Sequence, residues 1–288
     1  MNELARRPIG VFDSGVGGLS VLRALWSELP EEDFVYVADA GHAPYGEKDD
    51  LAVLMRAQAL THELRYRYGI KALVVACNTA TAAAIAELRA SHPDLPIVGI
   101  EPAVKPAMAQ TRTGGVGVLA TRGTLQSEKF RTLLQSLSAT AAPKLQACDG
   151  LADAIERNDA MKIEALCTEY TRAIGPFGQN FGDCDTVVLG CTHYPFALDT
   201  LQRLCGPTVL FVEGGTPVAK RTAQVLATHC LRHPDTNRLG QTEFVTTGDK
   251  QALAAALQRW LGVLPDSANL APNQAVGPMS SGAPAKQM

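Results

Sequence analysis

Two short apolar runs that each end in a cysteine constrain most strongly what this chain can fold into. The first run, residues 73–75, leads to Cys77, and the second, residues 187–189, leads through Gly190 to Cys191. β-branched runs of this length are typical of buried strands, and a polar segment and then a helical pattern follow each one. Open α/β sheets bind their ligands at the carboxyl ends of their strands. The two cysteines therefore predict a site that faces both of them.

The composition is that of an ordinary globular chain. The sequence has 288 residues, of which 46% are hydrophobic and 19% charged, and its formal net charge is −3. This length suits one large domain or two small ones, and the charge gives no overall basic field for nucleic acid. The uncharged stretch 72–86 is interrupted by polar residues and is shorter than the roughly 20 residues of a membrane span. We therefore expect a cytoplasmic protein that binds neither a membrane nor nucleic acid directly.

The other cysteines are expected to pack as small apolar side chains. The sequence has seven cysteines, an odd number, and none are spaced as CxxC, so neither a disulfide framework nor a zinc site is expected. Cys77 and Cys191 differ because hydroxyl, amide and imidazole groups follow them. A helix N-terminus also lowers the pKa of a thiol, which favours proton transfer by these two residues. We expect neither a metal nor a cofactor.

A glycine-rich turn after the first predicted strand is a second candidate site. The strand covers residues 8–12, the turn begins with Asp13 and Ser14, and leucines at helical spacing follow. The turn differs from a dinucleotide fingerprint because Ser20 stands where the third glycine belongs. It is either a tight turn without a ligand or a set of backbone N–H groups that suits an anion such as a carboxylate. Asp13 favours a site, since a carboxylate at a strand end usually caps the helix or takes part in chemistry.

The chain also contains an internal repeat. Residues 116–124 align with residues 9–17, which places Thr121 on Ser14, and Cys191 follows Cys77 at a similar offset. This pattern predicts two similar α/β lobes that face one another across a cleft. From Pro265 onward the chain is rich in Pro, Ala, Ser and Gly without periodicity, which predicts a disordered tail.

Two thiols that face one cleft suit proton transfer at a carbon centre. One thiol removes a proton from one face of the carbon and the other delivers a proton to the opposite face, while His193 and Asp13 tune or relay those protons. An alternative is a thiol hydrolase that uses Cys191 and His193 and leaves Cys77 without a role. A third possibility is a module that binds its ligand in the cleft without reacting with it.

The motifs at these positions resemble those of the cofactor-independent glutamate racemases. The matching segments are Phe-Asp-Ser-Gly-Val-Gly-Gly-Leu at 12–19, Ala-Pro-Tyr-Gly at 43–46, Val-Ala-Cys-Asn-Thr-Ala at 75–80 and Leu-Gly-Cys-Thr-His-Tyr-Pro at 189–195. The similarity runs from about residue 9 to residue 261. Aspartate racemases look similar, but they usually have glutamate where this sequence has His193. The resemblance implies interconversion of L- and D-glutamate for peptidoglycan, with another acidic amino acid such as aspartate as the alternative substrate.

The resemblance also implies roles for individual residues. Cys77 would handle the proton of D-glutamate and Cys191 that of L-glutamate, with Asp13 and His193 as the auxiliary groups on those sides. Glu156 matches a helix glutamate found near the substrate amine or His193, although Asp149 stands where many relatives have proline. The residues expected to hold the substrate are Asp13, Ser14, Pro44, Tyr45, Gly46, Cys77, Asn78, Thr79, Thr121, Thr124, Cys191, Thr192 and His193.

The fold that the resemblance implies is α/β, with two similar doubly wound lobes and the active site between them. Residues 1–98 and 209–264 would form the first lobe, which carries Asp13 and Cys77. Residues 99–208 would form the second, which carries Thr121 and Cys191, and residues 265–288 would be the tail. Glutamate is the expected small-molecule partner, and a homodimer is left open.

Overall fold

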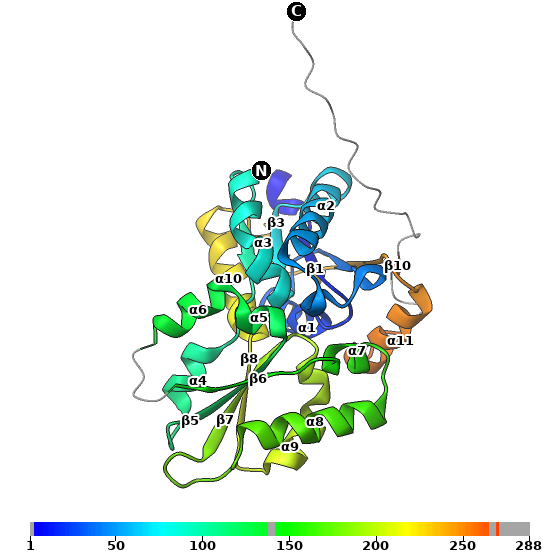
Figure 1. Ribbon diagram of the computed structural model, residues 1–288. Coiled ribbons are helices and arrows are strands. Elements are labelled where there is room, and N and C mark those ends of the chain that lie inside the picture. Colours follow the sequence, from blue (N-terminus) through cyan, green and yellow to red (C-terminus); the bar gives the residue numbers. More distant parts are fainter. Residues whose placement is uncertain (1–2, 138–141, 265–268, 271–288) are drawn as a thin grey trace, which may run out of the picture.

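The computed structural model describes residues 3–137, 142–264 and 269–270, and it contains two parallel sheets (Figure 1). The first sheet has the strand order β10-β9-β2-β1-β3-β4, and the second has the order β6-β5-β7-β8. The strands of the first sheet are β1 (Ile9–Asp13), β2 (Phe34–Ala38), β3 (Ala72–Val75), β4 (Ile97–Gly99), β9 (Thr242–Thr246) and β10 (Asn269–Leu270). Those of the second sheet are β5 (Gly115–Ala120), β6 (Lys144–Ala147), β7 (Cys184–Gly190) and β8 (Leu210–Glu213).

The internal repeat of the sequence is visible in the order of the strands. The order β2-β1-β3-β4 of the first sheet recurs as β6-β5-β7-β8 in the second. Strand β5 therefore corresponds to β1 and β7 to β3, as the alignment of Thr121 with Ser14 and of Cys191 with Cys77 predicts. The prediction of two similar doubly wound α/β halves is confirmed.

Helices cover both faces of each sheet. Along β1, Ile9 and Val11 pack on one side of the sheet while Phe12 packs on the other, which is the alternation expected of a strand buried on both faces. The helices on the first sheet are α1 (Leu19–Glu28), α2 (Asp50–Tyr68), α3 (Asn78–Ser91), α10 (Gly215–Thr228) and α11 (Lys250–Leu261). Those on the second sheet include α4 (Val104–Gln110), α6 (Glu128–Gln135), α7 (Leu151–Glu156), α8 (Ala160–Ile174) and α9 (Leu198–Cys205). Within the described ranges, no helix has both the length and the apolar content that crossing a membrane requires.

Strand β8 corrects the predicted return of the chain at residue 209. Leu210–Glu213 pair in parallel with β7, so this strand completes the second sheet. The physical reason is that β7 and β8 are joined through α9, and a right-handed crossover of this kind places the second strand beside the first. Helix α10 is the first element to pack back on the first sheet, against α1. The predicted boundary after residue 98 is also one residue early, since β4 ends at Gly99.

Residues 122–135 form two helices, α5 (Arg122–Gln126) and α6, because Ser127 leaves the helical conformation and its hydroxyl accepts a hydrogen bond from the N–H of Phe130 at 3.1 Å. The predicted tail also needs correction. Part of the predicted disordered tail is ordered, since Asn269–Leu270 pair with β9, whose outer edge would otherwise present unpaired backbone groups. The rest of that tail lies outside the described residues.

Candidate active site

The predicted site residues converge on one cavity of about 190 Å³, at the carboxyl ends of strands from both sheets. Cys77 enters it after β3 and Cys191 after β7, so the two thiols come from corresponding places in the two sheets. The predicted residues that line the cavity are Ser14, Pro44, Tyr45, Gly46, Cys77, Asn78, Thr79, Thr121, Glu156, Cys191, Thr192 and His193.

Asp13 and Thr124 are the two expected residues that do not line the cavity. The Asp13 side chain is fully buried, accepts a hydrogen bond from the N–H of Gly18 at 2.8 Å and accepts another from the hydroxyl of Thr192 at 3.4 Å. Thr124 accepts a hydrogen bond from the hydroxyl of Thr121 at 2.9 Å. Asp13 and Thr124 therefore each contact a residue that lines the cavity, and both lie directly behind the cavity wall.

Cys77 is buried at the N-cap of α3. Its sulfur accepts from the N–H of Ala80 at 3.4 Å, and its thiol donates to the hydroxyl of Ser14 at 3.8 Å. Burial raises the pKa of Cys77 and the Asp13 carboxylate raises it further, against the lowering by the Ala80 N–H. The predicted lowering by the helix N-terminus is therefore wrong for this thiol, because desolvation outweighs a single hydrogen bond. Cys77 rests as a neutral thiol, which is a proton donor.

Cys191 belongs to a chain of polar contacts with His193 and Glu156. The sulfur of Cys191 lies 3.8 Å from Nδ1 of His193, and Nε2 of His193 lies 2.7 Å from Oε2 of Glu156. Burial lowers the pKa of His193, but the contacts with Cys191 and with the carboxylate of Glu156 raise it well above its usual value. The two thiols therefore differ in their polar partners, which are the hydroxyl of Ser14 at Cys77 and the imidazole of His193 at Cys191.

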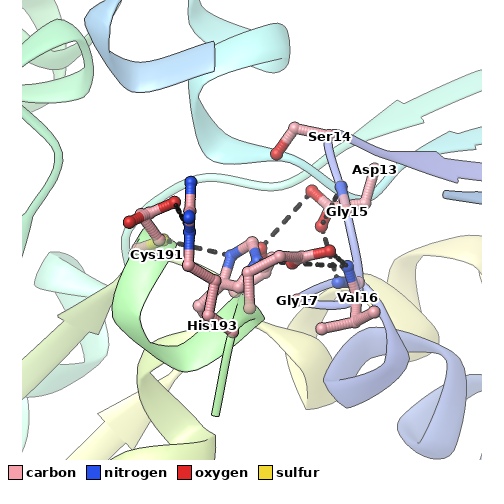
Figure 2. A network of polar contacts seen from close by, with 12 residues as sticks. Asp13, Ser14, Gly15, Val16, Gly17, Cys191 and His193 are labelled. Carbon is pink, nitrogen blue, oxygen red and sulfur yellow. Dashed lines mark hydrogen bonds and ion pairs between the residues drawn. The ribbon is translucent and has the colours of Figure 1, made fainter. Parts of the chain in front are cut away.

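The glycine-rich turn after β1 does hold a carboxylate, and the carboxylate is that of Glu156 from α7. The N–H of Val16 donates to Oε2 of Glu156 at 3.0 Å. Figure 2 shows the imidazole of His193 between Cys191 and this turn. A Cβ atom at Gly15 would lie 2.4 Å from Oε2 of Glu156, and one at Gly17 would lie 2.3 Å from Nδ1 of His193. Glycine is therefore required where the Glu156–His193 pair meets the turn.

No pattern in the sequence predicts that the following charged side chains line the cavity. Arg122 forms an ion pair with Asp149, and Arg157 forms one with Asp153 at 2.8 Å; all four residues line the cavity. They lie on short helices and connections where isolated charges ordinarily indicate only a solvated surface. No group of three or more His, Cys, Asp or Glu side chains within residues 3–137, 142–264 and 269–270 is arranged to hold a metal ion.

Comparison with known proteins agrees with this architecture. Residues 9–220 match the Asp/Glu/hydantoin racemase family. A glutamate racemase of Ectopseudomonas mendocina is 46% identical over 264 residues, which are 91% of this chain and 97% of that protein. The crystal structure of a glutamate racemase isoform from Bacillus anthracis has a TM-score of 0.81 at 30% identity and covers 93% of this chain and 97% of its own. Escherichia coli glutamate racemase, solved with L-glutamate and the activator UDP-MurNAc-Ala, has a TM-score of 0.76 at 29% identity, with coverage of 92% and 97%.

Two matching α/β halves with a thiol from each in one cavity define a racemase-type fold and site. The chain belongs to the Asp/Glu/hydantoin racemase family, and it is similar to that family's glutamate racemases over nearly its whole length.

Proposed function

We propose that the protein interconverts L- and D-glutamate without a cofactor, by proton transfer at Cα between two thiols. The observation that carries this proposal is that Cys77 and Cys191, which follow corresponding strands of the two sheets, line one cavity. The high similarity to glutamate racemases supports glutamate as the substrate. The D-glutamate that is formed serves peptidoglycan synthesis in the cytoplasm. The active form is a monomer or a homodimer, and the site is the same in both.

The two sheets support a division into two lobes with the substrate between them. We assign residues 3–99 and 214–264 to the first lobe and the described residues between 100 and 213 to the second. Cys77 then acts from the first lobe and Cys191 from the second. A substrate held between them presents one face of Cα to each thiol, which is what inversion requires.

The proposed proton transfers use one thiol on each face of Cα. The thiolate of Cys191 takes the proton from Cα of L-glutamate, and the electron pair of the broken C–H bond moves into the α-carboxylate. The thiol of Cys77 then donates its proton to the opposite face of Cα, which gives D-glutamate and leaves a thiolate on Cys77. The next D-glutamate reacts in the reverse direction, so each enantiomer meets the protonation state that its own conversion needs.

Asn78 is placed to hold the ammonium group of the substrate. It lines the cavity and is 4% exposed, and its Oδ1 has no hydrogen-bond partner in the part of the chain that the structure describes. A buried acceptor without a partner costs about 1–3 kcal/mol, so a bound donor such as an ammonium relieves that cost. The cation also stabilises the negative charge that develops at the neighbouring Cα.

The test of the proposed function is conversion of pure L-glutamate by the purified protein in buffer without cofactor, followed by chiral chromatography. We expect a final mixture with equal amounts of the two enantiomers, and slower conversion of L-aspartate measured side by side. Racemisation of aspartate but not glutamate would overturn the substrate assignment. A covalent acyl-enzyme on Cys191 in a mass spectrum, without racemisation of either amino acid, would instead support a hydrolase.

Replacing Glu156 by glutamine is expected to lower the pKa of His193, because it removes a carboxylate whose hydrogen bond and charge both raise it. Since the raised pKa lies in the folded state, the imidazolium contributes stability that is complete below about pH 6.5 and is lost as the pH rises through the folded value. In the variant the folded pKa is lower, so this contribution is smaller and its loss is complete at a lower pH. The alkaline limb of the pH profile of kcat should move downward, with kcat at neutral pH reduced about 10-fold.

An NMR titration of His193 measures the same shift directly. The matched control is Glu164→Gln, which breaks a partly exposed ion pair with Arg203 and should leave the pH profile unchanged. The two enantiomers are equally stable, so kcat/KM must fall equally in both directions. An effect on one direction is therefore read from kcat. An unshifted alkaline limb and an unshifted His193 titration would contradict the role given to Glu156.

A further inference from the structure

Asp39 is a buried carboxylate directly behind one wall of the cavity. We propose that it is a positioning residue, which holds the wall segment 40–47 at a fixed place relative to the substrate. The inference rests on the proposed function and adds to it a residue that does not line the cavity itself. Asp39 follows β2 at the carboxyl edge of the first sheet, and its side chain is fully buried.

Four side chains from three parts of the fold converge on this carboxylate. Oδ2 accepts from the hydroxyl of Tyr45 at 2.5 Å and from Nε of Arg56 at 3.1 Å. Oδ1 accepts from the second guanidinium nitrogen of Arg56 at 2.7 Å and from the hydroxyl of Thr247 at 2.8 Å, and it lies 3.1 Å from Nδ1 of His42. A bidentate arginine with further donors on the same carboxylate is a strong and geometrically specific arrangement.

These contacts tie the wall segment at both of its ends. At its start, the N–H of Gly41 donates to the hydroxyl of Thr247 at 3.1 Å, and that hydroxyl in turn donates to Asp39. At its end, Tyr45 is 1% exposed and bonded to the same carboxylate. Between the two ties, Ala43 and Pro44 line the cavity. The network therefore fixes the chain on both sides of Ala43 and Pro44, which line the cavity.

The held segment also meets the second lobe. A Cβ atom at Gly46 would lie 2.9 Å from Cβ of Thr121, and a Cβ at Gly123 would lie 3.3 Å from the carbonyl oxygen of Gly46. Any movement of this wall changes its distance from Thr121 on the opposite side of the cavity. Because the wall segment lines the cavity but carries neither of the two thiols, we expect the network to act mainly on substrate binding.

Thr247→Val is the sharpest test, because valine has the shape of threonine and Thr247 does not line the cavity. We expect KM for glutamate to rise about 3- to 10-fold, with kcat at saturation changed less than about 2-fold, since one or two hydrogen bonds of ordinary strength are lost. Tyr45→Phe removes the other tie and should raise KM at least as much. In hydrogen–deuterium exchange, residues 40–47 should exchange faster in both variants, while α3 does not change.

Asp94→Asn is the matched control, since it breaks an exposed bidentate pair with Arg65 on the same helix, α2, away from the cavity. Its KM and its exchange at 40–47 should equal those of the wild type. Unchanged KM and unchanged exchange in both Thr247→Val and Tyr45→Phe would overturn the proposal. If the wild type does not racemise glutamate, the proposed function fails, and the exchange of residues 40–47 still decides whether Asp39 holds the wall.

Discussion

Replacement of Cys77 or Cys191 by serine is expected to reduce racemisation of glutamate by at least about 10³-fold, because a serine hydroxyl is too weak an acid to serve as a proton carrier here. Serine has nearly the same size, so the fold should be preserved. Loss of either residue removes the acid or the base from one face of Cα and thus blocks both directions. Chiral chromatography of the product measures the loss, and circular dichroism checks the fold.

Cys205→Ala is the control for these variants. Cys205 is a buried thiol at the end of α9 that does not line the cavity. Its replacement should lower stability by about 1 kcal/mol and leave kcat within about 2-fold of the wild type. Substantial racemisation by Cys77→Ser would mean that one thiol is sufficient, and the two-thiol mechanism would be wrong.

Gly17→Ala is expected to reduce kcat about 100-fold although it adds one methyl group. The new Cβ would lie 2.3 Å from Nδ1 of His193 and 2.7 Å from the hydroxyl of Thr192, so both side chains must move. Movement of His193 separates it from Cys191 and removes the contact between the imidazole and the sulfur. A displacement of about 1 Å costs on the order of 10²-fold in rate when a catalytic group is involved. Steady-state kinetics measures the effect.

A double-mutant cycle of stabilities tests whether the new methyl group contacts the imidazole of His193. The free energies of unfolding are compared for the wild type, Gly17→Ala, His193→Ala and the double variant. If the methyl group acts by contact with the imidazole, Gly17→Ala should cost at least about 0.5 kcal/mol less stability in the His193→Ala background. Additive costs would show that the contact with His193 is not the source of the defect.

The features that the sequence predicts correctly are those where the chemistry of the residues and the local pattern coincide. The runs that end at Cys77 and Cys191 predicted both strand ends, because a buried strand followed by polar residues has few other interpretations. The alignment of Thr121 with Ser14 predicted the repeat that the order of the strands confirms. Local patterns thus located the two thiols and the doubly wound fold.

What the sequence could not supply are relations between distant segments. The turn after β1 suits an anion, but its occupant, Glu156, lies 140 residues from Val16 along the chain. The apolar run of β8 reads the same whichever sheet it joins. Burial of Cys77 reverses the pKa shift expected from its place at a helix N-terminus. The role inferred for Asp39 depends on Arg56 and Thr247, which no motif connects.

The most direct test of the two-thiol account is the reaction of L-glutamate in D₂O without added cofactor, stopped early, with the two enantiomers separated by chiral chromatography before proton NMR of each. The D-glutamate formed first should carry deuterium at Cα, because the thiol of Cys77 has exchanged with solvent, while the remaining L-glutamate keeps its proton. D-glutamate that retains the original proton would show transfer by a single group and would contradict the account. If the Cα–H signal of glutamate does not decrease at all although the protein is folded, glutamate racemisation itself would be contradicted.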